Sequence, residues 1–161
     1  MPDSGHPELR TQHSALILPD GLLGTQVDLG TVTVTRDMIH AYAVSVDDRE
    51  TLAGDCLTAP PTFFLSLRRG MTPEIALPAG TVGVYGGHDL IFHDTIRAEH
   101  TYRIRARLAE VYEKSGRSGP LTIVVREAVV ATLDGTPVVE IVERQIIRRT
   151  PDAATGAAEA P

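Results

Sequence analysis

His88 is the side chain with the plainest capacity for proton transfer in this 161-residue sequence. Histidine titrates closer to neutral pH than any other side chain, so His88 can orient a substrate or act as a base. Gly86 and Gly87 precede it, and glycine permits close approach of a ligand to the backbone, which makes Gly87 a candidate binding residue. The alternative is a histidine at a strand end that is hydrogen-bonded to the backbone.

A metal centre is not predicted from the histidines and the cysteine. His93 follows His88 by five positions, and in a strand this spacing points the two imidazoles to opposite faces of the sheet. Cys56 is the single cysteine, which excludes an internal disulfide and a cysteine-based metal cluster. We therefore predict no metal and no cofactor.

Arginines alternate with other residues at Arg103, Arg105 and Arg107, so a strand would place all three on one side. Two interpretations are open. The arginines form a cationic strip, or they belong to a solvated face on which acidic residues are their partners, which is the usual meaning of such alternation.

The elements that must position these residues are mainly strands. Two turns, Lys114–Pro120 and Asp134-Gly135, separate long runs rich in β-branched residues. Asp-Gly between apolar runs is a strong hairpin signal, because both residues accept positive φ. Residues 86–149 are therefore predicted to form an antiparallel meander.

Helices are predicted upstream of the meander. A β-branched strand at Thr31–Thr35 leads into a helix over residues 36–46, which Thr35 can cap, and residues 47–56 are polar and irregular. After Pro60 and Pro61, the segment Thr62–Arg69 is apolar nearly all round, as in a helix buried on every side. This order predicts an α+β protein with the hot-dog fold, an antiparallel sheet wrapped around a central helix. Such a sheet leaves an edge strand, so we expect a dimer.

Composition is typical of one domain, which we place at residues 16–150 between a flexible N-terminus (1–15) and a disordered tail (151–161). The formal net charge of −6 argues against nucleic acid as a partner. No apolar run approaches the ~18 residues of a membrane span. No secretory signal is expected at the N-terminus, so we predict a cytoplasmic protein.

Residues 25–149 resemble the MaoC-like hydratase/dehydratases, most closely the N-terminal-type half called the FAS1-like dehydratase domain. The resemblance rests on the order and spacing of short motifs: Tyr42-Ala43, Ala59-Pro60-Pro61-Thr62-Phe63, Gly87-His88, Phe92-His93 before Ile96-Arg97-Ala98, and Val111–Gly119. It implies reversible hydration of trans-2-enoyl thioesters to (R)-3-hydroxyacyl thioesters, carried on coenzyme A or an acyl carrier protein. Such chemistry needs an acid and a base beside the α-carbon and one water.

This sequence departs from the family's catalytic pattern, which is an Asp, four residues, and a His in the loop after the first helix. Asp47 and Asp48 occupy the Asp end, but Leu52 and Ala53 stand where the histidine is expected. The resemblance therefore implies a subunit that lacks the full dyad and acts with a partner hot-dog subunit, in a homodimer or a heterodimer.

Two alternatives remain open from the residues. The chain is a self-sufficient enzyme in which His88 and Asp47 or Asp48 perform altered chemistry on a thioester or a polyketide intermediate, or it is a non-catalytic acyl-binding module. Candidate residues for the acyl pocket are Tyr42, Phe63 and Tyr85, although each type is more often plain core.

Overall fold

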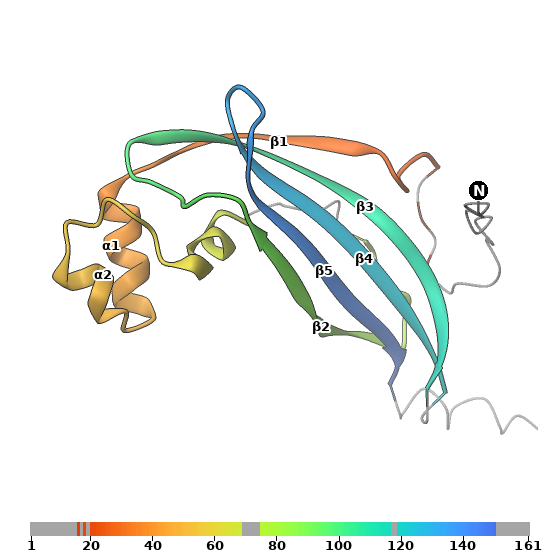
Figure 1. The fold of residues 1–161 in the computed structure, drawn as a ribbon. Coiled ribbons are helices and arrows are strands. Elements are labelled where there is room, and N and C mark those ends of the chain that lie inside the picture. Colours follow the sequence, from red (N-terminus) through yellow and green to blue (C-terminus); the bar gives the residue numbers. More distant parts are fainter. Residues whose placement is uncertain (1–15, 17, 19, 69–74, 117–118, 151–161) are drawn as a thin grey trace, which may run out of the picture.

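A computed structural model describes residues 16, 18, 20–68, 75–116 and 119–150. The predicted flexible N-terminus (1–15) and disordered tail (151–161) lie outside the described residues. Five strands form one antiparallel sheet in the order β1-β3-β4-β5-β2. Figure 1 shows the sheet curving, with the helices gathered on its concave side. The elements are β1 (Gln26–Val34), α1 (Arg36–Ser45), α2 (Arg49–Ala53), η1 (Pro61–Arg68), β2 (Thr81–Phe92), β3 (His100–Gly116), β4 (Gly119–Thr132) and β5 (Pro137–Arg149).

The predicted meander is correct for β3, β4 and β5 and wrong for β2. Strand β2 pairs with β5, from Thr81 opposite Arg149 to Phe92 opposite Val139, so it lies at an edge of the sheet. The Asp134-Gly135 turn joins β4 to β5 as predicted, with Gly135 at φ +95°. No tight turn joins β2 to β3, and the chain between them crosses to the far side of β4 and β5 (Figure 1).

The first helix forms as its cap predicts. The side chain of Thr35 accepts a hydrogen bond from the backbone N–H of Met38 at 3.2 Å, and α1 runs from Arg36 to Ser45. The segment after α1 differs from the prediction, because the polar residues 47–56 include the short helix α2. A local cap at Asp48 is enough to start this helix without an apolar face.

The central helix is more one-sided than predicted. η1 is a 3₁₀ helix in which Phe63, Phe64 and Leu67 are buried, whereas Thr62 and Ser66 are exposed. Phe64 and Leu67 lie three residues apart and so share one row of the 3₁₀ helix, and Phe63 lies beside them. Ser66 turns its hydroxyl back to the carbonyl of Phe63, to which it donates a hydrogen bond at 2.7 Å. The buried side chains pack in the main core with residues from α1 and the inner face of the sheet.

A second, smaller apolar cluster lies farther along the strands and contains Leu108, Val124 and Ile147. Two charged residues of the inner face, Arg126 and Glu143, stand between this cluster and the main core. Within the described residues, no helix is long and apolar enough to cross a membrane.

Candidate functional site

Two neighbouring aspartates follow α1, and the structure gives them different surroundings. Asp48 caps α2: its Oδ1 accepts a hydrogen bond from the backbone N–H of Thr51 and its Oδ2 accepts one from the Thr51 hydroxyl, both at 3.1 Å. Asp47, at φ +51°, has a side chain that is 76% exposed and lies 3.3 Å from Arg49. Only Asp48 is positioned to contribute to a pocket.

The pocket beside Asp48 has a volume of about 320 Å³, and none of its described lining residues is a histidine. Leu52 and Ala53, at the positions where the histidine was expected, lie in α2 and do not line it. Two further carboxylates and a buried cysteine, which the sequence analysis did not select, complete its polar wall. The lining residues are Asp48, Glu50, Thr51, Gly54, Asp55, Cys56, Leu57, Thr58, Ala59, Pro60 and Pro61.

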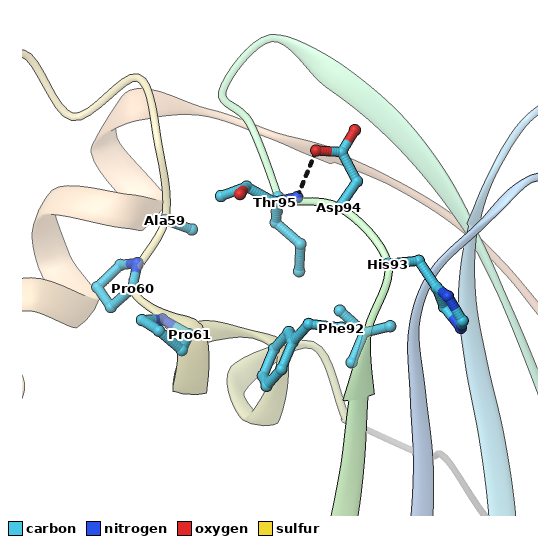
Figure 2. A pocket seen from close by; sticks show the side chains of 9 residues that line it. Ala59, Pro60, Pro61, Phe92, His93, Asp94 and Thr95 are labelled. Atoms are coloured by element: carbon cyan, nitrogen blue, oxygen red, sulfur yellow. Dashed lines mark hydrogen bonds between the residues drawn. The ribbon is translucent and has the colours of Figure 1, made fainter.

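A larger pocket of about 450 Å³ lies on the other side of the Ala59–Pro61 segment, which lines both pockets. Apolar side chains from Phe92, Ile96 and Val139 form part of its wall. At its rim, Oδ1 of Asp94 accepts a hydrogen bond from the backbone N–H of Thr95 at 2.7 Å (Figure 2). A pocket with a partly apolar wall and polar groups at its rim can hold a small organic ligand.

His93 borders this larger pocket, but its ring does not point into it. Figure 2 shows the imidazole directed away from the cavity. Its Nε2 lies 2.8 Å from Oε1 of Glu140 in β5. His93 therefore ties the end of β2 to β5 rather than presenting a base to the cavity.

His88 lies inside β2 rather than at the start of a strand, which corrects the sequence-based placement. A register shift between Tyr85 and Gly87 marks a bulge, and Gly87 has φ +112° with open space beside its Cα. The bulge lets the Tyr85 hydroxyl contact Nδ1 of His88. His88 stands opposite Glu143 and lines neither pocket, so the structure does not bring it together with Asp48.

The candidate acyl-pocket residues are distributed rather than clustered. Tyr42 donates a hydrogen bond to the carbonyl of Thr62 at 3.0 Å, and its ring meets Phe63 edge-on with centroids 5.5 Å apart. Phe63 is 1% exposed and belongs to the main core, whereas Tyr85 is 58% exposed on β2. Tyr42 and Phe63 thus join α1 to η1 and line neither pocket.

The three alternating arginines do share one face of β3, opposite the buried Ile104 and Ala106. Arg107 pairs with Glu127 at 2.6 Å, and Arg103 lies 3.7 Å from Asp28. For Arg107, the interpretation as a solvated face with an acidic partner is confirmed. Within the described ranges, no three His, Cys, Asp or Glu side chains gather where they could hold a metal ion.

Comparison with known proteins assigns the chain to a family. The family model described as "FAS1-like, dehydratase domain region" matches residues 22–141, and the chain belongs to this family. A comparison with curated proteins finds no significant match.

Solved structures that resemble the chain confirm its hot-dog fold. A truncated HadBC (3R-hydroxyacyl-ACP dehydratase) complex from Mycobacterium tuberculosis shares 20% identity over 80% of this chain and 99% of that chain, with a TM-score of 0.56. The R-hydratase PhaJ1 from Pseudomonas aeruginosa shares 14% identity over 86% and 89%, with a TM-score of 0.54. A hot-dog-like protein from Thermanaerovibrio acidaminovorans shares 15% identity over 82% and 87%, with a TM-score of 0.52.

Proposed function

We propose that this chain is a subunit of an (R)-specific enoyl-thioester hydratase or 3-hydroxyacyl-thioester dehydratase, and that a second hot-dog subunit supplies the catalytic dyad. The substrate is an acyl thioester of coenzyme A or of an acyl carrier protein, handled in the cytoplasm. Membership of the dehydratase family supports the reaction class. The HadBC structure, which is a complex of a 3R-hydroxyacyl-ACP dehydratase, supports an assembly of more than one chain.

The observation that carries the proposal is the pocket beside Asp48. Hydration needs one group that takes a proton from water and one that delivers a proton to the α-carbon. The described lining offers carboxylates and a thiol but no imidazole, and both oxygens of Asp48 are engaged by Thr51. This arrangement favours a helix-capping role for Asp48 over the role of a catalytic base.

The open edge of strand β2 supports the proposal of a partner subunit. One of its sides pairs with β5 and the other has no strand neighbour in the described sheet. Val82, Val84 and Ile91 on β2 are exposed large apolar residues. An open edge with apolar side chains is a ready template for pairing with another strand.

The decisive experiment measures hydration of crotonyl and longer enoyl thioesters by the purified chain and by the chain co-expressed with a hot-dog subunit that has Asp-x4-His. We expect very little turnover from the chain alone and robust turnover from the complex. Replacing the partner's dyad histidine by alanine should abolish that turnover. Robust turnover by this chain alone would contradict the proposal.

Asp48 offers a matched pair of variants for the same assay. Asparagine caps a helix about as well as aspartate, whereas alanine removes the cap at a cost of about 1 kcal/mol. Asp48→Asn should therefore preserve both the melting temperature and the activity of the complex, and Asp48→Ala should lower the melting temperature. Loss of activity in Asp48→Asn with unchanged stability would instead show that this carboxylate takes part in the chemistry.

A further inference from the structure

A small hollow lies on the outer face of the sheet, the face that carries the alternating arginines. Its volume is about 90 Å³, and strands β1, β3 and β4 and the turn after β4 form its wall. Neither pocket near the Ala59–Pro61 segment shares a lining residue with it. The lining residues are Gln26, Arg103, Arg105, Val129, Ala131, Thr132, Leu133 and Gly135.

Arg105 differs from its neighbour two positions along the strand. Arg107 is neutralised by Glu127, with Nε and Nη2 at 2.8 and 2.6 Å from Oε2. Arg105 has no acidic group within ion-pair distance among the described residues, although it has the same strand, face and charge. Its guanidinium is therefore available to a ligand in the hollow.

Arg103 is a second arginine whose side chain has an unsatisfied hydrogen-bond donor. Its Nε is buried and donates no hydrogen bond within the described part of the chain. The nearest carboxylate, Oδ2 of Asp28, lies 3.7 Å from this nitrogen, which is too long for a hydrogen bond. The other oxygen of Asp28 accepts a hydrogen bond from the backbone N–H of Gly30 at 2.9 Å.

The other acidic residues near the hollow are held elsewhere. Glu127 binds Arg107 and Glu140 binds His93. Asp134, in the turn after β4, accepts hydrogen bonds from the Thr132 hydroxyl and the Thr136 backbone N–H. Asp28 is thus the carboxylate that competes most directly for the two arginines.

We propose that this hollow is a binding site for a phosphate-type oxyanion, with Arg103 and Arg105 as its cationic ligands and the Gln26 amide as a further donor. Guanidinium groups present N–H donors in a planar fork that matches phosphate oxygens. The hollow is much smaller than the two pockets near the Ala59–Pro61 segment, which favours a compact anion over an acyl chain. The ligand is either free phosphate or a phosphate of a larger molecule, and the site stands independently of the proposed hydratase function.

The test is calorimetric titration of the whole chain with inorganic phosphate at constant low ionic strength. Wild-type protein should bind phosphate, and Arg105→Gln should weaken binding at least about tenfold, as loss of hydrogen bonds from a charged donor implies. Asp28→Asn keeps an acceptor for Gly30 while removing the competing charge, so it should bind up to about fivefold more tightly. Differential scanning calorimetry of each variant checks that it is folded.

Arg107→Gln is the matched control, because it removes the same charge from the same strand outside the hollow. It should leave phosphate affinity unchanged. The proposal is overturned if wild-type protein takes up no phosphate, or if Arg107→Gln weakens binding as much as Arg105→Gln. Competition by coenzyme A but not by dephospho-coenzyme A would support the site and assign it to a carrier phosphate, whereas phosphate binding that neither displaces would support it as a site for the free ion.

Discussion

Nη1 of Arg126 lies 3.8 Å from Oε1 of Glu143 on the inner face of the sheet, where the two side chains are only 10% and 15% exposed. Strands β4 and β5 place the two residues directly opposite each other. In the same row, Leu108 of β3 stands beyond Arg126, and His88 of β2 stands beyond Glu143. The charged pair therefore lies in one row between the buried Leu108 and the edge strand β2.

Breaking this pair from one side should be costly. Glu143→Gln or Arg126→Met removes one member of a nearly buried ion pair, and we expect a loss of about 3–5 kcal/mol in the free energy of unfolding. The double replacement Arg126→Met with Glu143→Leu removes both charges and should recover most of that loss. Urea denaturation of the four proteins measures both effects.

The exposed pair Arg107–Glu127 serves as the reference for the buried one. Its side chains are 48% and 36% exposed, so Arg107→Gln should cost less than about 1 kcal/mol. Equal costs for the buried and exposed pairs would show that Arg126 and Glu143 gain nothing from their enclosure.

His88 can be tested by measuring rate and melting together in the complete assembly. If it contributes a hydrogen bond or a proton, His88→Ala should lower turnover at least tenfold, about 1.4 kcal/mol of barrier, with little change in melting temperature. Its contact with Tyr85 allows a structural role instead, in which the substitution costs stability and leaves turnover per folded molecule intact. Unchanged turnover would end the functional interpretation.

The β2 edge should govern assembly. Val84 is 40% exposed on this strand, and lysine on an edge strand discourages pairing with another chain. We expect a dimer of hot-dog domains by light scattering at micromolar concentration, and monomers for Val84→Lys. Val44→Lys on α1, where the valine is 57% exposed, is the control and should leave the dimer intact. A wild-type monomer would contradict this expectation.

The stability of the protein should depend on pH through the Asp134 carboxyl. The hydrogen bond from the Thr132 hydroxyl, followed by that from the Thr136 N–H, lowers the pKa of this carboxyl below its ordinary value of 3.8. Because the folded pKa is the lower one, the stabilisation is present above the unfolded pKa and is lost as pH falls through the folded pKa. Thr132→Val should raise the pKa of Asp134 toward 3.8 in an NMR titration. No change in this pKa would rule out the Thr132 hydroxyl as its cause.

Sequence reasoning succeeded where the chemistry is local. The Thr35 cap and the Asp134-Gly135 turn act over two to four residues, so the pattern alone locates α1 and the β4–β5 hairpin. The position of β2 beside β5 depends on pairing between segments that are distant in the sequence, and no turn residue between them predicts that pairing. Asp48 followed by Glu50 does carry an N-terminal helix signal, which the polar character of the segment concealed.

The candidate site was less predictable for the same reason. Its aspartate could be located from the family resemblance, but no local pattern indicated that Glu50, Asp55 and Cys56 would line one pocket with Asp48. The contact between Tyr85 and His88 depends on a bulge between them, and a bulge changes which side chains share a face. A one-residue irregularity of this kind leaves little trace in a pattern of alternation.

The strand order also fixes when the chain can finish folding during translation. Residues 137–149 leave the ribosome after the other four strands, yet they occupy the position between β4 and β2. Until they emerge, β2 has none of the strand partners that the structure gives it, and its apolar residues are open to other nascent chains. Strand β5 therefore completes the sheet. If translation stalls before Pro137, strand β2 has been synthesised but cannot yet pair with the rest of the sheet.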